Sequence, residues 1–481
     1  MRSYHEAIFE GAMLFFLYIK ERYMYRIDFN KPEHIHFIGI GGISMSGLAE
    51  ILLGAGFTVS GSDAGGSPLV DRLRSLGAVI TIGQRAENIT PGIDAVVYTA
   101  AIHENNPELR AAKEAGLPLL TRAELLGEVM DNYKVSVAVA GTHGKTTTTG
   151  MDAHIMLAAG LDPTVSVGGI LPSIGGNIRV GATENFLAEA CEYTNSFLEL
   201  RPLISVILNV DADHLDFFKD IDEIAASFNR FAKNTAPGGV LIVNRDTQKF
   251  SEIIKGVRCK ILTTGLDSIA DYMAADITFD ELGCASFTCF EFGAPIGTFS
   301  LRVPGIHNVS NALSAIALGR VLGLSPETIA AGLLAFSGVD RRFEIKGKMN
   351  GTTVVDDYAH HPTEIAATLK AAKAYPHREL WVIFQPHTYT RTKALLPEFA
   401  EALSHADHVI LADIYAARED DIYGVSSRDV ADAVARLGTD AYYFDSFEKI
   451  EQFVREHCVD NDLLITMGAG NVTNIGPALL S

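Results

Sequence analysis

The chain has 481 residues, 48% of them hydrophobic, and its 39 basic and 59 acidic residues give a formal net charge of −20. Domains usually contain about 100–200 residues, so a chain of this length is expected to form three. The negative charge, which no basic run offsets, argues against nucleic acid or an anionic membrane surface as a partner. The five cysteines lack CxxC spacing, which argues against a disulfide framework or a zinc site and favours a cytoplasmic protein.

The N-terminal segment carries an apolar run from Ala12 to Ile19 ahead of the first expected strand. This run is too short for a transmembrane helix, which needs about 20 apolar residues. It is followed directly by Lys20 instead of the small residues of a secretory cleavage site. We therefore expect residues 1–23 to be a non-functional leader or the product of a misassigned start, with Met24 as the true beginning. An ordinary helix and a targeting segment are the alternatives.

From residue 34 to residue 116, short β-branched runs such as "HIHFIGI" and "DAVVYTA" alternate with helix-like stretches such as "SMSGLAEILLGAG" and "NPELRAAKEAG". This alternation predicts a parallel sheet covered by helices. It restarts at "KVSVAVAG" and again at "TTVVDDYA", while the segment 270–304 is typical of consecutive antiparallel strands and is followed by two helical segments. We therefore predict an α/β protein with domain boundaries near 133 and 338, which gives domains of residues 24–133, 134–338 and 339–481.

A glycine-rich turn between an expected strand and helix, residues 141–146, has the sequence "GTHGKT". An ordinary phosphate loop has a glycine where Val139 stands here, so this loop is shortened. Its backbone N–H groups and the start of the following helix can bind phosphate oxygens, with Lys145 as a point charge for the outer phosphates. Thr146 holds the position whose hydroxyl binds magnesium. The alternative is a structural turn that merely contains Gly-Lys-Thr.

Two expected strand ends offer further ligands for that magnesium ion. Glu189 ends the apolar run of "NFLAEACEY", and "VILNVDADHLD" ends in Asp211, Asp213, His214 and Asp216. Ligands of open α/β sheets gather at the carboxyl ends of the strands, and magnesium prefers hard oxygen ligands. His214 could instead be an ordinary loop residue whose hydrogen bonds are satisfied.

An earlier loop, residues 39–44, has the sequence "GIGGIS" and imitates a dinucleotide fingerprint in which Ser44 replaces the third glycine. Asp63 stands about where a ribose-binding acid belongs. Nothing downstream is typical of a hydride-transfer site, so another phosphorylated ligand is favoured over a nicotinamide cofactor. A structural turn is the remaining alternative.

Three expected strand ends of the last segment carry polar side chains. "VVDDYAHHPTE" contains His360 and His361, "FQPHTYTRT" offers His387 and Arg391, and "MGAGN" is rich in glycine. A proline follows the two adjacent histidines, so helix capping or ligand contact is favoured over a metal site. Three polar strand ends that face one way predict a binding face.

Eight motifs occur in an order that closely resembles the Mur ligases, the ATP-dependent ligases of peptidoglycan synthesis. They are "HFIGIGGISMSGLAE", "GTHGKTTTT", "NVDADHLD", "GIHNVSNALSA", "DRRFE", "DDYAHHPTE", "FQPHTYTRT" and "GAGNV". The resemblance runs from about Met24 to the end of the chain, and the shortened loop is typical of Mur ligases and the related folylpolyglutamate synthetases. It implies an N-terminal Rossmann-like domain, a central P-loop-type ATPase domain with a small antiparallel β insertion, and a C-terminal Rossmann-like domain.

The implied activity is ligation of L-alanine to UDP-N-acetylmuramate through an acyl phosphate, with ATP and Mg²⁺ as cofactors and ADP and phosphate as products. The implied partners are small molecules, without membrane insertion, and the protein would be a monomer or homodimer. The alternatives are the recycling ligase that adds a tripeptide to the same UDP-sugar and a folylpolyglutamate-type ligase. A nicotinamide dehydrogenase and a non-catalytic nucleotide-sensing module are alternatives from other classes.

The resemblance also implies a role for individual residues. The ATP-binding residues would be Gly141, Thr142, His143, Gly144, Lys145, Thr146, Thr147, Asn308, Asn311, Arg342 and Asp357. The UDP-sugar would contact Gly39, Ile40, Gly41, Gly42, Ser44 and Asp63, and the alanine and muramate would contact Tyr358, His360, His387 and Arg391. Magnesium would be held by Thr146, Glu189 and His214. Lys145, His360 and Arg342 would be catalytic, with His360 or Asp213 as the base for the alanine amine.

Three positions depart from the pattern of many relatives. Cys191 stands for an aspartate, Thr388 for an arginine and Gln84 for a histidine. The contacts that these residues make in the relatives are therefore not carried over to this chain.

Overall fold

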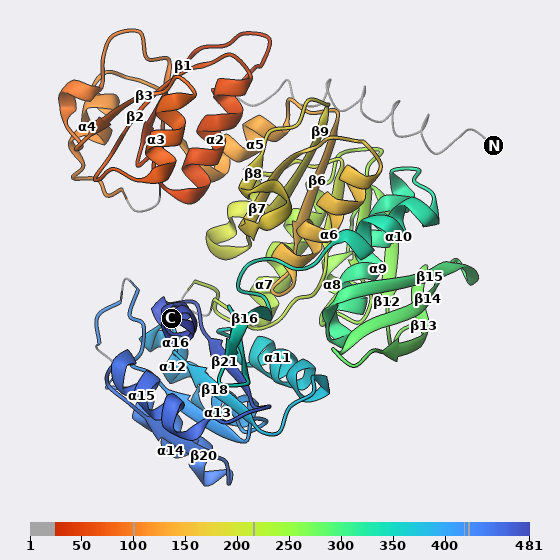
Figure 1. Ribbon diagram of the computed structural model, residues 1–481. Coiled ribbons are helices and arrows are strands. Elements are labelled where there is room, and N and C mark those ends of the chain that lie inside the picture. The colour runs from red at the N-terminus through yellow and green to blue at the C-terminus, as the bar shows by residue number, and fades with distance from the viewer. Residues whose placement is uncertain (1–24, 100–101, 215–216, 418, 422–423) are drawn as a thin grey trace. The chain divides into compact units, whose positions relative to one another are not determined.

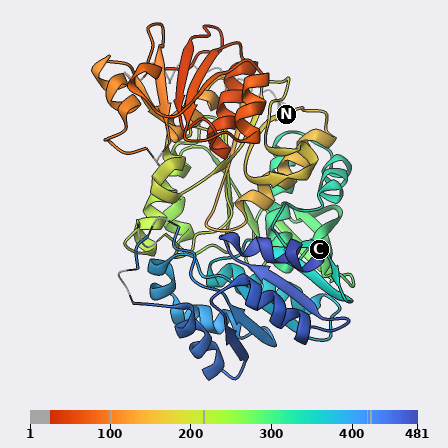
Figure 2. The same ribbon diagram turned by 60° about the vertical axis from the view of Figure 1, so that its left-hand side comes forward.

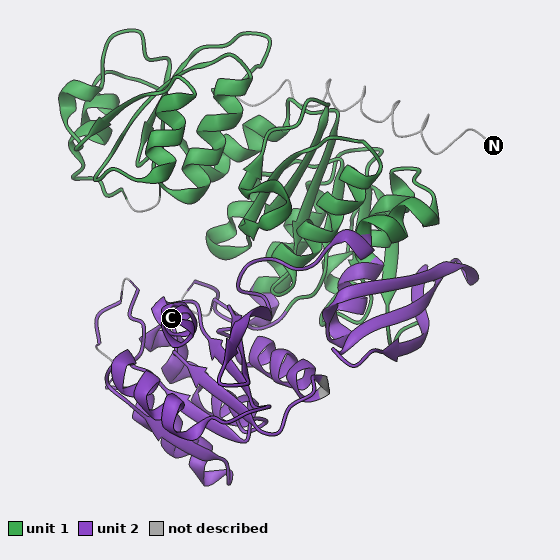
Figure 3. Cartoon of the chain, viewed as in Figure 1, with its two compact units in different colours: residues 1–210, 224–270, 314–332 green, residues 211–223, 271–313, 333–481 purple. Residues whose placement is uncertain are grey.

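The computed structural model describes residues 25–99, 102–214, 217–417, 419–421 and 424–481 (Figure 1). The expected leader, residues 1–23, lies outside the described residues. The chain divides into two compact units (Figure 3): unit 1 consists of residues 1–210, 224–270 and 314–332, and unit 2 of residues 211–223, 271–313 and 333–481. The domain boundaries near 133 and 338 stay a prediction.

The N-terminal part of unit 1 is a five-stranded sheet with the order β3-β2-β1-β4-β5. All neighbouring strands are parallel, as the alternating pattern predicts. Its strands are β1 (His34–Ile38), β2 (Thr58–Asp63), β3 (Val79–Ile82), β4 (Ala95–Tyr98) and β5 (Leu119–Thr121). Its helices are α2 (Ile43–Gly54), α3 (Pro68–Ser75), η2 (Ala86–Asn88), α4 (Pro107–Glu114) and α5 (Arg122–Met130).

Unit 1 also contains a second sheet, in which the order is β12-β11-β10-β6-β9-β7-β8. The central strand β6 is buried and runs parallel to both β9 and β10. The strands are β6 (Val135–Ala140), β7 (Thr164–Leu171), β8 (Gly176–Arg179), β9 (Asn185–Ala190), β10 (Ile204–Ile207), β11 (Val240–Asn244) and β12 (Lys260–Gly265). The helices along this stretch are α6 (Lys145–Ala158), η3 (Pro172–Ile174), η4 (Tyr193–Glu199), α7 (Ile221–Lys233) and α8 (Phe250–Ile253).

The segment predicted to form antiparallel strands does so. It forms β13 (Tyr272–Phe279), β14 (Cys284–Glu291) and β15 (Ala294–Pro304), each antiparallel to the next. The two predicted helical segments follow as α9 (Ile306–Val321) and α10 (Pro326–Ala335).

The C-terminal sheet lies within unit 2 and has the order β16-β17-β21-β18-β19-β20. Only β16 is antiparallel to its neighbour among these described pairs. The strands are β16 (Glu344–Met349), β17 (Thr352–Asp357), β18 (Leu380–Phe384), β19 (His408–Leu411), β20 (Asp440–Tyr443) and β21 (Leu463–Met467). The helices are α11 (Pro362–Ala374), α12 (Tyr389–Ala394), α13 (Leu396–Leu403), α14 (Ser427–Arg436), α15 (Phe447–His457), η5 (Asn471–Asn474) and α16 (Ile475–Leu480).

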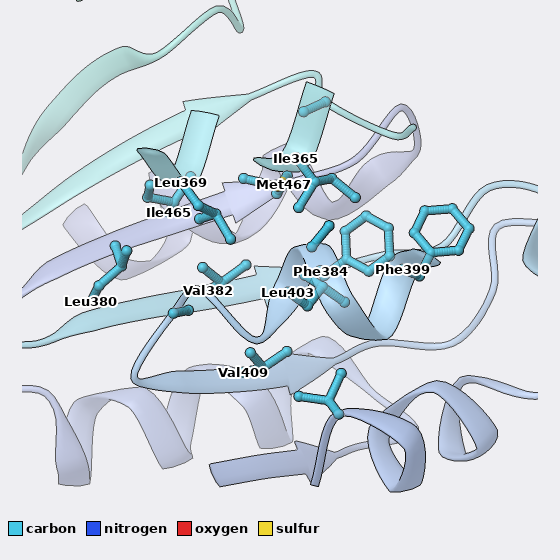
Figure 4. Close-up of a cluster of buried hydrophobic side chains, with 14 of the residues drawn as sticks. Ile365, Leu369, Leu380, Val382, Phe384, Phe399, Leu403, Val409, Ile465 and Met467 are labelled. Carbon is cyan, nitrogen blue, oxygen red and sulfur yellow. The ribbon is translucent and has the colours of Figure 1, made fainter. Parts of the chain in front are cut away.

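Successive side chains of each strand point to opposite faces of this sheet, and each face packs into its own buried core. Leu380, Val382 and Phe384 of β18 pack into a core with residues of α11 and α13 (Figure 4). Trp381 and Ile383 belong to a second core with residues of α15 and α16. Each large side chain that is fully buried stabilises the fold by roughly 1.5–3 kcal/mol. The C-terminal sheet is therefore covered by helices on both faces, and Figure 2 shows it from a second direction.

The register of the C-terminal sheet brings three strand ends together. Asp357 at the end of β17 lies opposite Met467 of β21, which lies opposite Phe384 of β18. The polar segments that follow these strands therefore leave the same edge of the sheet, as predicted. Within the described part of the chain, no helix combines the length and the apolar character needed to span a membrane.

Candidate active site

The predicted phosphate loop joins β6 to α6 in unit 1. Gly141 and Gly144 have φ values of 152° and 81°, a backbone region that residues other than glycine rarely adopt. Gly144 is also the N-cap of α6 and provides no side-chain cap. The first N–H groups of α6 are thus left without the side-chain acceptor that commonly caps a helix, which suits an anionic ligand.

Asn209, which follows β10, holds the loop from one side. Its Oδ1 accepts a hydrogen bond from the His143 backbone N–H (2.8 Å), and its Nδ2 donates to the His143 carbonyl (2.9 Å). Its own carbonyl accepts from the N–H of Thr142 (3.1 Å). No sequence motif pointed to Asn209, although its place just after a strand next to β6 is the signal that could have found it.

Glu192, which follows β9, holds the loop lysine on the other side. The ammonium group of Lys145 lies 2.9 Å from Glu192 Oε2 and donates to the carbonyls of Gly141 (2.6 Å) and Thr142 (3.0 Å). Burial alone would lower the pKa of Lys145, but the Glu192 carboxylate outweighs it and raises that pKa above its ordinary value. The loop therefore contains a fixed positive charge.

Glu189 lies at the edge of the sheet from which the phosphate loop leaves, because it pairs with Val139 near the end of β6. The N–H of Gly168 on β7 donates to Glu189 Oε2 (2.7 Å). A Cβ on Gly168 would lie only 2.6 Å from Glu189 Oε1, so the carboxylate rests against bare backbone. Gly168 is a second candidate position that the sequence did not reveal.

The candidate metal ligands of unit 1 are Glu189 and Thr146. Thr146 is 9% exposed. A carboxylate and a hydroxyl are hard oxygen donors of the kind that Mg²⁺ prefers, so these residues fit that ion. The third candidate, His214, belongs to unit 2, where its N–H donates to Asp213 Oδ1 (2.6 Å). Its role as a ligand stays a prediction.

The earlier glycine-rich loop follows β1, and Asp63 at the end of β2 holds it directly. Asp63 Oδ2 accepts a hydrogen bond from the Gly41 N–H (2.8 Å). A Cβ on Gly41 would lie 2.9 Å from both that oxygen and Val70 Cγ2, so the position has no room for a side chain. Gly42, the N-cap of α2, provides no side-chain cap. This helix start therefore resembles that of α6.

In unit 2, the turn after β17 is fixed by Asp357, which is 4% exposed. Its two carboxylate oxygens accept hydrogen bonds from the N–H groups of Phe343 and Ala359, both at 2.8 Å. Burial raises the pKa of Asp357 to about 6. Through its two hydrogen bonds, the Asp357 carboxylate joins the segment that carries Arg342 to the turn that carries His360.

Four of the predicted side chains form one continuous group. The Arg342 guanidinium lies 5.3 Å from the centre of the Tyr358 ring, and that ring lies 5.2 Å from the His360 ring. The His360 ring lies in turn 5.9 Å from the His387 ring. The structure thus brings together two predicted strand-end residues, His360 and His387, and two residues that the resemblance named, Arg342 and Tyr358.

His360 has the protonation state that a general base needs. Burial lowers its pKa to about 4, so the imidazole is neutral at pH 7. Its Nδ1 lies 3.0 Å from the Tyr358 carbonyl oxygen, which can only accept a hydrogen bond, so Nδ1 carries the proton. The lone pair is consequently on Nε2.

Asp213, the other candidate base, is paired with Arg391. Arg391 Nη2 lies 3.1 Å from Asp213 Oδ1, and Arg391 Nη1 donates to the His387 carbonyl (3.1 Å). Burial alone would raise the pKa of Asp213, but the charge of Arg391 outweighs it and lowers that pKa below its ordinary value. A carboxylate that is so hard to protonate is a weak base, which favours His360.

Two further predicted residues have local partners. Asn308 Nδ2 donates to the Pro304 carbonyl (2.8 Å), and Asn311 Nδ2 donates to Asn308 Oδ1 (3.0 Å), at the start of α9. Their role in ATP binding stays a prediction.

The positions that depart from relatives are also engaged. Gln84 Oε1 accepts from Asn106 Nδ2 (2.6 Å), and the Thr388 hydroxyl donates to Glu419 Oε1 (2.7 Å). Burial raises the pKa of the Cys191 thiol. Gln84 and Thr388 therefore each form a hydrogen bond in this structure.

Three family models match successive parts of the chain. They are the Mur ligase family, catalytic domain, over residues 34–134; the Mur ligase middle domain, over residues 139–319; and the Mur ligase, glutamate ligase domain, over residues 341–470.

Two curated relatives are similar over their whole length. The UDP-N-acetylmuramate–L-alanine ligase of Agathobacter rectalis is 62% identical over 457 residues, which cover 95% of this chain and 100% of the relative. The enzyme of the same name from Lachnospira eligens is 57% identical over 458 residues, with the same coverage.

Two solved structures are also similar. The UDP-N-acetylmuramate–alanine ligase from Thermotoga maritima is 29% identical with a TM-score of 0.77, and the alignment covers 93% of this chain and 98% of that one. A murein peptide ligase from Psychrobacter arcticus is 28% identical with a TM-score of 0.67 over the same shares of the two chains.

Proposed function

Since this chain belongs to the Mur ligase family, we propose that it joins L-alanine to UDP-N-acetylmuramate with ATP, giving UDP-N-acetylmuramoyl-L-alanine, ADP and phosphate. The observation that carries this proposal is the 62% identity, over its whole length, to a relative named for that reaction. The uncapped loop around Lys145 and the neutral His360 support it, because the reaction needs a phosphate site and a base.

The chemistry requires activation, because a carboxylate oxygen is a poor leaving group. The lactyl carboxylate of the UDP-sugar attacks the γ-phosphorus of ATP, and ADP leaves. The alanine nitrogen then attacks the carbonyl carbon of the acyl phosphate, and phosphate leaves. The enzyme must therefore position three anionic or polar reactants and neutralise their charge.

The residues of unit 1 would bind both nucleotides. The N–H groups of residues 141–144 and the Lys145 ammonium would bind the phosphates of ATP. Thr146 and Glu189 would hold Mg²⁺, which neutralises phosphate charge when bound. The loop of residues 39–44, held by Asp63, would bind the diphosphate of the UDP-sugar.

The residues of unit 2 would serve the acceptor end. The Nε2 atom of His360 would accept the proton that the alanine amine loses. Arg342 and Arg391 would offset the negative charge of the phosphoryl group and of the carboxylates, and Tyr358 and His387 would line the alanine and muramate site. We further infer a cytoplasmic protein whose partners are these small molecules.

The decisive experiment measures phosphate release from ATP and UDP-N-acetylmuramate with either L-alanine or the tripeptide of the recycling reaction. We expect release that depends on both the UDP-sugar and L-alanine. Release with the tripeptide and none with L-alanine would identify the recycling activity instead. Release that does not require the UDP-sugar would contradict both.

A further inference from the structure

Glu364, in the first turn of α11, contacts two of the proposed active-site residues at once. Its Oε2 accepts a hydrogen bond from the His360 backbone N–H (3.2 Å) and lies 3.3 Å from His360 Nδ1. Its Oε1 lies 3.7 Å from Arg342 Nη1. The Glu364 side chain is only 12% exposed, so these contacts are shielded from water. Neither the sequence motifs nor the proposed function gives this glutamate a role.

The position of Glu364 also suggests a simpler role as a helix cap. Pro362 is the first residue of α11 and His361 its N-cap, so Glu364 is the third helical residue. Glutamate or glutamine at this position commonly bonds a backbone N–H at the helix start. A capping role needs only the bond to the His360 N–H. It does not require the second oxygen to lie beside Arg342.

The two side chains that Glu364 contacts both pack against the Tyr358 ring. Arg342 covers that ring at 5.3 Å, and the His360 ring meets it edge-on at 5.2 Å. A carboxylate that contacts both the guanidinium and the imidazole restricts both side chains relative to the ring. Reactive groups need such restriction, because a misplacement of about 1 Å can slow a reaction on the order of a hundredfold.

We propose that Glu364 is a positioning residue that fixes His360 and Arg342 relative to each other through its two carboxylate oxygens. Its negative charge matters as well as its shape, since its partners are a guanidinium and an imidazole N–H. This inference rests on the proposed function, in which His360 accepts a proton and Arg342 stabilises the phosphoryl group.

The test is Glu364→Gln, because glutamine can still cap α11 but carries no charge. We expect kcat for alanine-dependent phosphate release to fall about 10- to 100-fold, while the melting temperature stays close to that of the wild type. The matched control is Glu398→Gln, since Glu398 is the third residue of α13 and is exposed. It should leave kcat and the melting temperature unchanged. A Glu364→Gln enzyme with wild-type kcat would overturn the proposal.

Double variants separate positioning from a purely structural effect. If Glu364 acts through its two partners, adding Glu364→Gln to His360→Asn or to Arg342→Gln should reduce kcat much less than it does in the wild type. Losses that multiply in either background would overturn the proposal. A wild-type enzyme without alanine-dependent phosphate release would instead refute the proposed function, which keeps the two failures distinct.

Discussion

Glu192 and Lys145 form a buried ion pair, with Glu192 Oε2 lying 2.9 Å from the lysine ammonium and the two side chains 2% and 14% exposed. Loss of one partner of such a pair leaves an uncompensated charge, which commonly costs about 3–5 kcal/mol. We expect Lys145→Ala to lower the free energy of unfolding in urea by about that amount. It should also lower kcat by about 100- to 1,000-fold, as loss of a charge-stabilising group at the reacting centre does.

The double variant Lys145→Ala/Glu192→Gln separates these two effects. Since it removes the stranded carboxylate charge, it should regain most of the stability but none of the activity. If the double variant is as unstable as the single one, the ion pair does not explain the loss.

The neutral imidazole of His360 has a consequence for the pH dependence of catalysis. A base works in its unprotonated form, and the pKa of His360 is lowered to about 4 by burial. At saturating substrates, kcat should therefore hold steady from pH 8 down to about pH 5 and fall only as the pH approaches that value. His360→Asn should lower kcat by about 10²- to 10⁴-fold. A loss of activity centred near pH 6.5 would contradict the assignment.

A side chain at position 168 would clash with the Glu189 carboxylate, because a Cβ on Gly168 would lie 2.6 Å from Glu189 Oε1. Gly168→Ala should displace the carboxylate and raise the Mg²⁺ concentration for half-maximal activity about 10- to 100-fold, as changes beside a metal ligand do. Mg²⁺ binding followed by calorimetry should weaken in parallel. Gly176→Ala is the control, because the nearest atom to its added Cβ would be the Ile178 carbonyl oxygen at 4.0 Å. An unaltered Mg²⁺ requirement in Gly168→Ala would speak against Glu189 as a ligand.

Asp152 on α6 is fully buried, and neither carboxylate oxygen has a hydrogen-bond partner among the described residues. Burial raises its pKa well above its ordinary value of 3.8. The folded state then binds a proton that the unfolded state releases, so stability falls as the pH rises from 3.8 towards the raised native pKa. Asp152→Asn removes this dependence. Its advantage in melting temperature over the wild type should therefore be larger at pH 8 than at pH 5.

A melting-temperature difference between Asp152→Asn and the wild type that is equal at the two pH values would show that Asp152 does not titrate in this way. Asp71, which is exposed on α3, provides the control. Asp71→Asn should give the same small difference at both pH values.

The sequence was most informative where a strand leads into a turn. The shortened loop around Lys145, the parallel sheets and the strand end at His360 all follow from patterns that are contiguous in the chain. Glu192 and Asn209 could not be assigned in this way, because β6 pairs with β9 and β10, which come later in the chain. Their contacts with the loop depend on that strand order and on side-chain direction.

The threonine run after Lys145 shows the same limit. Thr146 and Thr147 could be assigned by resemblance, but Thr148 and Thr149 offered only hydroxyls near a helix start. In the structure Thr148 and Thr149 are completely buried, and neither hydroxyl has a hydrogen-bond partner among the described residues. Thr148 and Thr149 precede Asp152 by four and three residues, so all three side chains lie on the same buried face of α6.

The glycine N-caps of α2 and α6 have a thermodynamic consequence. Helices α3 and α5 supply their own side-chain acceptors, Ser67 and Thr121, whereas the helices at the two candidate nucleotide loops supply none. A bound phosphate would complete each of these helix starts, so folding and substrate occupancy would be linked. Each nucleotide would then raise the melting temperature, in proportion to the logarithm of its concentration. The metabolite pool of the cell would in this way contribute to the persistence of the folded enzyme.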